Sequence, residues 1–332
     1  MTLNIGIVGI GFISEYHLKG FRSDTRALVA GVTRSYHGTA ADNARQRKAL
    51  EDFAVKHSVK AYESFEAMAA SPDIDALVIT SINPEHYGQV LTALENGKHV
   101  LIEKPVVNSA REIDELKKKS QEKGLVVLPA HNFAYRGAVI EAKRVIADKT
   151  LGAIQYASFI DSFLGENSVN ERTWRSKHAL SWGGALMDSG THQVYQSLAL
   201  LGAPQKVQAF CSRNVLTLND EDIASVQTYY TSGAICHIVQ NWGSNHGGDA
   251  AGIRIIGSKG SLRIADALYV NGKKINEDVT YDGSFVNQAR HFISAVADGA
   301  APLSTLDDAK TVLAIVHAAY ESSTSGKTVP LE

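Results

Sequence analysis

Cysteine, long apolar runs and net charge are all scarce in this chain of 332 residues. Its two cysteines, Cys211 and Cys236, have no neighbours at metal-site spacing, so we expect buried, reduced thiols and no metal site. Lysine and arginine number 33 against 35 aspartates and glutamates, which gives no electrostatic basis for nucleic acid or an anionic membrane as the main partner. No apolar run approaches membrane-spanning length.

Internal repeats, low-complexity segments and a basic, signal-like N-terminus are also missing. We therefore expect no signal peptide and a cytoplasmic protein. Hydrophobic residues make up 44% of the chain and charged residues 20%, as in ordinary globular proteins, and the length exceeds the usual size of one core. Two domains are therefore predicted.

The first part of the chain alternates between short apolar runs and helical patterns. Strands are predicted at residues 3–8, 27–33, 59–62, 76–80, 100–102 and 125–128. Helices are predicted from near Phe12, over residues 39–57, 64–70 and 85–95, and from a cap at Asn108 to Gly124. This order predicts an α/β fold with a parallel, doubly wound sheet, which binds ligands beyond the carboxyl ends of its strands.

The first strand runs into a glycine turn, Gly9-Ile10-Gly11-Phe12-Ile13-Ser14. The first glycine permits the tight turn, and the second lets a pyrophosphate approach the backbone at the start of a helix. Ser14 replaces the usual third glycine or alanine, but its small side chain still permits close packing of helix and strand. The pattern predicts a dinucleotide site, and an ordinary tight turn is the alternative.

The end of the second strand, Gly31-Val32-Thr33-Arg34-Ser35, lacks the acidic residue typical of NAD binding. Arg34 can bind a 2′-phosphate with charge-assisted hydrogen bonds, and the hydroxyls of Thr33 and Ser35 can add donors. We therefore predict NADP as the preferred cofactor. In the alternative, Arg34 points to solvent and the protein accepts both cofactors or prefers NAD.

Two further strand ends carry polar residues. Ser81 follows the strand at 76–80, and Glu103-Lys104-Pro105 follows the strand at 100–102. A cis bond before Pro105 would fix the direction of Lys104, although a solvated loop lysine is the common alternative.

The stretch Gly183-Gly184-Ala185-Leu186-Met187-Asp188-Ser189-Gly190-Thr191-His192 precedes apolar residues at helical spacing, so a helix is predicted over residues 184–201. Asp188 and His192 stand four residues apart, on one face of such a helix. A carboxylate beside an imidazole can orient the ring for proton transfer. A surface pair, or an aspartate facing the helix dipole, is the alternative.

The second part of the chain predicts successive strands. They are expected at residues 154–163, 206–213, 223–231, 234–242, 252–257 and 261–264, with a hairpin at Asn271-Gly272. Helices are expected at 138–148, 284–297 and 305–324, and an irregular stretch at 165–178 contains Trp174 and Arg175. This pattern predicts a large, mostly antiparallel sheet with helices on one face. The domain boundary is placed so that the domains are residues 1–127 and 128–332.

Several of these motifs together resemble the Gfo/Idh/MocA family of nicotinamide-dependent oxidoreductases. They are the glycine turn, Asn83-Pro84-Glu85-His86, Gly97-Lys98-His99-Val100-Leu101-Ile102-Glu103-Lys104-Pro105, and the stretch from Gly183 to His192. The resemblance implies a Rossmann domain followed by an α/β domain with a large open sheet. It also implies that Lys104, Asp188 and His192 form the catalytic set, and that the sheets pair subunits into a homodimer or homotetramer.

The predicted site follows from the strand ends and the resemblance. The cofactor-binding residues are Gly9, Gly11, Phe12, Ile13, Thr33, Arg34, Ser35, Ser81, Ile82, Asn83, His86, Glu103, Lys104, Asn132, Trp174 and Arg175. The substrate-binding residues are Lys104, Arg136, Asp188 and His192, although Arg136 could instead pair with a nearby acid. A loop anchor is the alternative for Trp174.

The predicted function is NAD(P)-dependent interconversion of a secondary alcohol and a ketone on a sugar, cyclitol or sugar derivative. One alternative is cleavage of a glycoside with tightly bound NAD(H), by transient oxidation and elimination. The other is a non-catalytic, nucleotide-binding regulator, which would have no need of the acid–base set.

Overall fold

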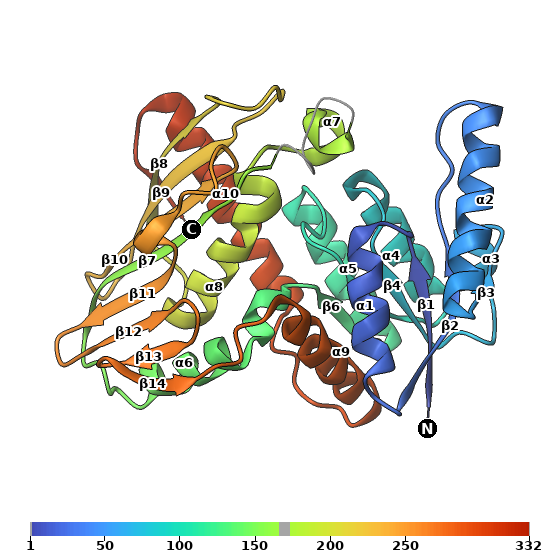
Figure 1. Cartoon of the computed structure of the whole chain (residues 1–332), viewed down its shortest axis with the longest axis horizontal. Helices are drawn as coiled ribbons and strands as arrows, with labels where there is room; N and C mark the ends of the chain where they lie inside the picture. Colours follow the sequence, from blue (N-terminus) through green and yellow to red (C-terminus); the bar gives the residue numbers. More distant parts are fainter. Residues whose placement is uncertain (1, 166–172, 332) are drawn as a thin grey trace. The chain divides into compact units, whose positions relative to one another are not determined.

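The computed structural model describes residues 2–165 and 173–331 and falls into two compact units (Figure 1). The first unit comprises Met1–Ala130 and Phe285–Leu306, and the second comprises His131–Ser284 and Asp307–Glu332. Part of the irregular stretch expected at 165–178, residues 166–172, lies outside the described residues. Within the described ranges, no helix is long and apolar enough to cross a membrane.

The first unit contains a six-stranded parallel sheet in the order β3-β2-β1-β4-β5-β6. Its strands are β1 (Leu3–Val8), β2 (Ala27–Thr33), β3 (Lys60–Ala61), β4 (Ala76–Ile79), β5 (His99–Ile102) and β6 (Val127–Pro129). Its helices are α1 (Phe12–Arg22), α2 (Ala40–His57), α3 (Phe65–Ala69), α4 (His86–Glu95), α5 (Ala110–Lys123) and most of α9 (Tyr281–Ala297). The central strands are fully buried because they are apolar on both faces. This confirms the predicted doubly wound fold.

Side chains with oxygen acceptors start three of these helices, α2, α3 and α5. Thr39 and Asp42 form a capping box at α2, in which each side chain satisfies the backbone amide of the other. The prediction that Asn108 caps α5 is wrong, because Ser109 is the N-cap and its hydroxyl accepts from the amide of Glu112. Both residues are good caps, and only the position where the chain turns decides between them.

The second unit contains a nine-stranded sheet in the order β14-β13-β12-β11-β7-β10-β9-β8-β15. Its strands are β7 (Ile154–Ser162), β8 (Lys206–Ser212), β9 (Ile223–Tyr229), β10 (Ile235–Asn241), β11 (Gly252–Gly257), β12 (Ser261–Ile264), β13 (Leu268–Val270), β14 (Lys273–Asn276) and β15 (Val329–Pro330). Only the β7–β10 pair among them is parallel, so the mostly antiparallel sheet is confirmed.

Helices cover one face of this sheet (Figure 1). They are α6 (Gly137–Ala147), α8 (Thr191–Leu201) and α10 (Leu306–Ser325), while the short α7 (His178–Ser181) precedes the Gly183-Gly184 pair. The covered face takes alternate residues of β10, including Cys236 and Ile238, which are fully buried. Burial raises the pKa of the Cys236 thiol to about 12, so it remains a protonated packing group.

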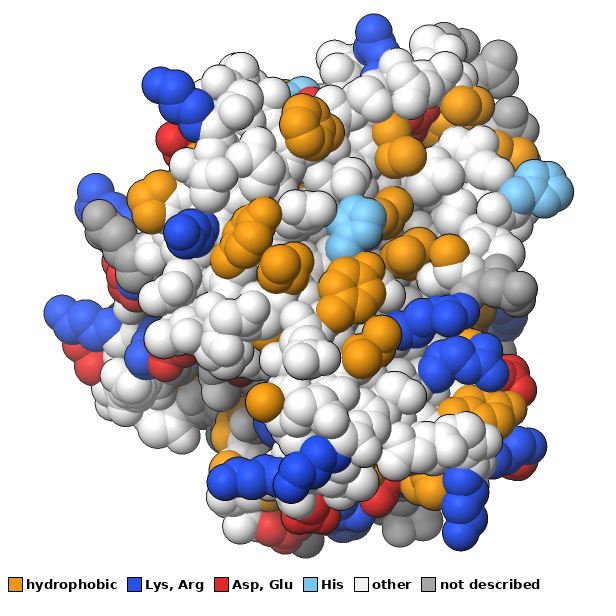
Figure 2. Space-filling model, turned by 90° about the vertical axis from the view of Figure 1, so that its left-hand side faces the viewer, with side chains coloured by type: hydrophobic (Ala, Val, Ile, Leu, Met, Phe, Trp, Pro, Cys, Tyr) orange, Lys and Arg blue, Asp and Glu red, His pale blue; other side chains and the backbone are white. Residues whose placement is uncertain are grey.

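The opposite face of the sheet exposes apolar side chains. Tyr156 on β7 is the register partner of both Ile235 on β10 and Ile256 on β11, so the three side chains form one row across the strands. These three residues are 38% to 45% exposed, and Phe210 on β8 is 69% exposed. Figure 2 shows hydrophobic side chains gathered on this side of the protein. We call these four residues the outer sheet patch.

Candidate active site

The turn after β1 contains two glycines, Gly9 with a positive φ and Gly11 with open space around its α-carbon. Gly9 has φ 103°, and a β-carbon there would lie 2.5 Å from the Thr80 hydroxyl oxygen, so only glycine fits. Gly11 starts α1 without a side-chain cap, and a β-carbon on it would meet nothing within 4 Å. An open space at the amino end of an 11-residue helix suits an anionic diphosphate. The chain beside Phe12 and Ile13 therefore fits a dinucleotide.

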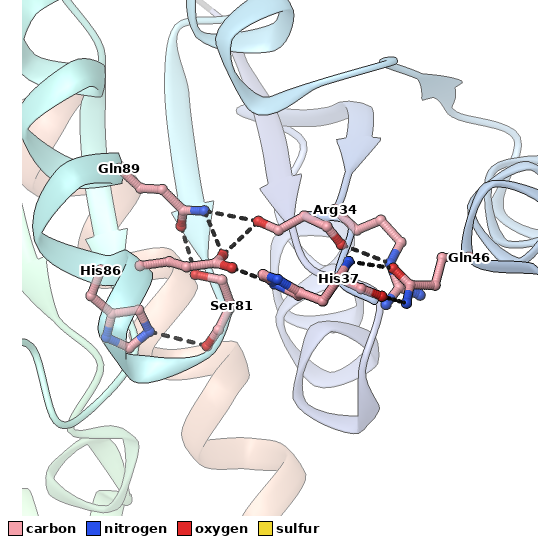
Figure 3. A network of polar contacts seen from close by, with 8 residues as sticks. Arg34, His37, Gln46, Ser81, His86 and Gln89 are labelled. Atoms are coloured by element: carbon pink, nitrogen blue, oxygen red, sulfur yellow. Dashed lines mark hydrogen bonds and ion pairs between the residues drawn. The ribbon is translucent and has the colours of Figure 1, made fainter. Parts of the chain in front are cut away.

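Polar side chains at the end of β2 form a network with residues that follow β4 (Figure 3). Glu85, in the short 3-10 helix η1 (Asn83–Glu85), accepts hydrogen bonds from the Ser35 hydroxyl at 2.5 Å and the Gln89 amide at 2.9 Å. Its second oxygen lies 2.6 Å from Nε2 of His37. The network therefore places a carboxylate beside the residues that the sequence assigns to the adenosine ribose.

This carboxylate stands near the end of β2, where the sequence pattern showed no acidic residue. No acid ends β2 itself, but Glu85 reaches the same place from a segment 50 residues further along, as its bond to Ser35 shows. Arg34 Nε donates to the Ser35 carbonyl at 3.2 Å. Burial lowers the pKa of Arg34, and the charges of Tyr36 and Glu85 oppose that shift. The Thr33 side chain is fully buried and donates to the Tyr62 carbonyl at 3.0 Å.

His86 ties the segments after β4 and β5 together. Its Nδ1 lies 2.9 Å from the Pro105 carbonyl oxygen, and its Nε2 lies 3.1 Å from that of Ser81. Burial lowers the pKa of His86, and these carbonyl oxygens oppose that shift. Asn83, three residues before His86, is buried, and Ile82 is partly exposed. Of the residues assigned to the cofactor, His86 has a clear structural role.

Lys104 follows a buried carboxylate and precedes a cis peptide bond to Pro105. Glu103 Oε1 lies 2.8 Å from Nε2 of His17 on α1, and Glu103 Oε2 accepts from the Lys104 amide at 3.2 Å. The Glu103 side chain is therefore engaged within the fold. These contacts fix the backbone from which the half-buried Lys104 side chain leaves.

In the second unit, three side chains form a stack. The Phe133 ring lies parallel to the His192 ring, with centroids 4.4 Å apart and an angle of 16°. The Arg136 guanidinium lies 3.8 Å from the centroid of the Phe133 ring, in a cation–π contact. Burial lowers the pKa of Arg136 and raises that of Asp161, and each charge opposes the shift of the other. Asn132 donates to the Ser284 hydroxyl at 2.8 Å.

The helix predicted over residues 184–201 forms from Leu186 to Leu201, but its first part is π-helical. After α7, Trp182 adopts φ 66°, and a π-helix η4 (Leu186–Gly190) precedes α8. Asp188 therefore lies in the wider π-helical turn and His192 in the first turn of α8. Arg175 Nε donates to Asp188 at 2.7 Å, and the Arg175 guanidinium lies 4.5 Å from the Trp174 ring. The predicted Trp–Arg pair is thus in contact with the predicted catalytic aspartate.

A buried carboxylate that the sequence reading missed anchors this π-helix. Glu221 accepts from the amides of Gly184 at 3.1 Å and Leu186 at 2.9 Å, and from the Tyr320 hydroxyl at 2.9 Å. Burial raises the pKa of Glu221, against these hydrogen bonds. A β-carbon on Gly184 would lie 1.9 Å from the Glu221 carbonyl oxygen, and one on Gly183 would lie 2.4 Å from the Tyr320 hydroxyl. The glycine pair is therefore required by this close approach.

Two family models match the chain. "Oxidoreductase family, NAD-binding Rossmann fold" matches residues 3–131, and "Oxidoreductase family, C-terminal alpha/beta domain" matches residues 143–331. The chain belongs to the Gfo/Idh/MocA oxidoreductase family. It is therefore a nicotinamide-dependent oxidoreductase. Among the described residues of this Gfo/Idh/MocA protein, no cluster of three or more His, Cys, Asp or Glu side chains could hold a metal ion.

Several dehydrogenases are similar to this Gfo/Idh/MocA protein. It is 25% identical to scyllo-inositol 2-dehydrogenase (NADP(+)) of Bacillus subtilis (strain 168), over 100% of this chain and 96% of that enzyme. It is 30% identical to trans-1,2-dihydrobenzene-1,2-diol dehydrogenase of Homo sapiens, over 66% of this chain and 63% of that enzyme. Its fold matches levoglucosan dehydrogenase in complex with NADH and levoglucosan, with TM-score 0.86, 19% identity and 99% coverage of both chains.

The predicted catalytic set is divided between the two units. Lys104 belongs to the first unit, with the residues assigned to the dinucleotide, whereas Asp188 and His192 belong to the second. In the first unit the Glu85 network joins residues at the ends of β2 and β4, and in the second unit Arg175 pairs with Asp188. Glu85, Glu221 and Tyr320 are the residues that the sequence reading missed. Glu85 belongs to the motif Asn83-Pro84-Glu85-His86. No sequence pattern links Glu221 to the glycine pair.

Proposed function

We propose that this protein is an NAD(P)-dependent dehydrogenase that interconverts a secondary alcohol and a ketone on a sugar, cyclitol or sugar derivative. The proposal is carried by the placement of Asp188, paired with Arg175, and of His192, stacked on Phe133, in the same helical segment. Such a set offers hydrogen-bond partners to a polyhydroxylated substrate and an imidazole for proton transfer. The inositol and levoglucosan dehydrogenases among the similar proteins support this substrate class.

In the direction of oxidation, the substrate loses a hydride from carbon and a proton from oxygen. The nicotinamide, when bound, accepts the hydride. His192 takes the hydroxyl proton as the general base, and Lys104 donates a hydrogen bond to the oxygen as negative charge develops there. Asp188 and Arg136 bind neighbouring hydroxyls, and Arg175 holds the Asp188 carboxylate in its direction. In reduction, the same groups return the proton.

A panel of monosaccharides, polyols and inositols tests the substrate class. Each compound is incubated with NADP or NAD, and formation of the reduced nicotinamide is followed by its absorbance. Accumulation of reduced cofactor with a free sugar or cyclitol supports the proposal. Release of product from a glycoside, with only catalytic amounts of cofactor and no net reduction, would instead show the elimination chemistry.

We also propose that NADP is the preferred cofactor. Arg34 stands beyond β2 with its Nε on the Ser35 carbonyl, and a guanidinium suits a 2′-phosphate. The B. subtilis relative is an NADP(+) enzyme by name, which supports the same choice. Dissociation constants of both oxidised cofactors, measured for the native protein and for Arg34→Ala, test this. A native preference for NAD, or an NADP affinity indifferent to Arg34→Ala, contradicts it.

The oligomer is a further part of the proposal. The outer sheet patch exposes Tyr156, Phe210, Ile235 and Ile256 on four strands of one sheet face. Exposed apolar clusters of this kind mark contact surfaces, and a self-complementary patch produces a symmetric dimer. We propose that two sheets pair through this patch in a homodimer or homotetramer. The cytoplasm remains the predicted compartment.

A further inference from the structure

Glu85 is held from three directions at the end of β2. Ser35 and Gln89 donate to one carboxylate oxygen at 2.5 and 2.9 Å, and His37 contacts the other at 2.6 Å. The Gln89 side chain is itself fixed, because its carbonyl oxygen accepts from the Ser81 hydroxyl at 2.6 Å. The Glu85 side chain is 18% exposed, whereas that of His37 is 56% exposed. The carboxylate thus keeps a fixed direction while remaining accessible.

Three ionisable groups therefore lie around the position expected for the adenosine ribose, and they differ in whether they attract or repel a 2′-phosphate there. Arg34 attracts a 2′-phosphate, and a protonated His37 does the same. Glu85 repels a phosphate and accepts hydrogen bonds from a free ribose hydroxyl, as the acidic residue at the end of strand two does in NAD-binding proteins. The charge of Glu85 acts on Arg34, since it opposes the lowering of the Arg34 pKa by burial.

We infer that Glu85 is a specificity-determining residue that limits the preference for NADP over NAD, and that His37 weakens its effect by its contact with the carboxylate. This inference rests on the proposed function, because it assumes that a nicotinamide dinucleotide binds at the glycine turn. The negative charge of a carboxylate near the surface, a few ångströms from a 2′-phosphate, lowers the affinity for the dinucleotide that bears this phosphate by roughly five- to tenfold. Arg34 and Glu85 therefore act in opposition on one phosphate.

The test is the ratio of NADP to NAD affinity, measured by titration calorimetry without turnover. Glu85→Gln removes the charge but keeps the size and one acceptor oxygen, so the ratio should rise roughly five- to tenfold. Glu122→Gln is the matched control, since it removes the same charge from an exposed position on α5 and should leave the ratio unchanged. A ratio in Glu85→Gln equal to that of the native protein overturns the inference.

Glu85→Asp separates the charge from the fit of the side chain, and it keeps the inference testable if Glu85→Gln does not fold. It retains the carboxylate, so its ratio should stay within about twofold of the native value. A ratio in Glu85→Asp as high as the value expected for Glu85→Gln would show that charge is not the cause.

The role of His37 is tested by a double-mutant cycle. His37→Gln should lower the NADP to NAD ratio when Glu85 is present and have a smaller effect in the Glu85→Gln background, because the two residues are in contact. Equal effects in both backgrounds would contradict this role of His37. A protein that binds neither dinucleotide contradicts the proposed function itself, whereas a normal affinity with an unmoved ratio contradicts only the role of Glu85.

Discussion

At the scale of single residues, His192 and Lys104 bear the proposed chemistry. The His192 ring is held against Phe133, and the backbone of Lys104 is fixed by Glu103 and the contacts of His86. We expect His192→Ala and Lys104→Ala each to lower turnover by roughly two to four powers of ten, because each removes a group that handles charge or a proton in the transition state. Dinucleotide affinity should change little, as measured by calorimetry. Lys119→Ala is the control, and near-normal turnover in both active-site variants would contradict the mechanism.

The sequence was most informative about residues whose chemistry is local. The Gly9 turn and the cis Lys104–Pro105 bond could be predicted because each depends on a few neighbouring positions. Glu85 could not be assigned in this way, since its effect depends on packing of the segment after β4 against the end of β2. A rule based on the end of the second strand alone therefore misses a carboxylate supplied by the segment after β4.

At the scale of elements, the π-helix η4 is the feature that hydrophobic periodicity could not predict. Apolar spacing does not distinguish an α-helix from a π-helical segment of five residues, because the segment is too short to define a separate period. The wider turn is held by Glu221 and Tyr320, which lie far away in the sequence. Long-range acceptors of this kind decide the local backbone, and no local pattern records them.

The glycine pair before η4 leads to a stability prediction. Gly184→Ala would place a β-carbon 1.9 Å from the Glu221 carbonyl oxygen, so the backbone must shift and the amide bonds to Glu221 weaken. We expect a loss of about 2–4 kcal/mol in the free energy of unfolding, seen as a lower Tm in thermal unfolding. Gly88→Ala on α4 is the control, because a β-carbon there meets nothing within 4 Å and alanine favours a helix. An unchanged Tm in Gly184→Ala would contradict the close approach.

At the scale of the whole molecule, each predicted sheet formed, because alternating βα units and successive hairpins specify their own topology. The outer sheet patch bears on the oligomeric state. A row of Tyr156, Ile235 and Ile256 on three adjacent strands has the breadth of a contact surface rather than of scattered exposed residues.

We therefore expect the native protein to run as a dimer or tetramer in size-exclusion chromatography with light scattering. Tyr156→Glu should shift the mass toward the monomer, because a buried and unpaired carboxylate at the centre of an apolar interface costs several kcal/mol. Val55→Glu is the matched control, since Val55 on α2 is 81% exposed and lies in the other unit, so the same charge there should leave the mass unchanged. A native monomer, or an oligomer equally sensitive to Val55→Glu, would contradict pairing through the outer sheet patch. An oligomer that resists Tyr156→Glu would place the subunit interface on another surface.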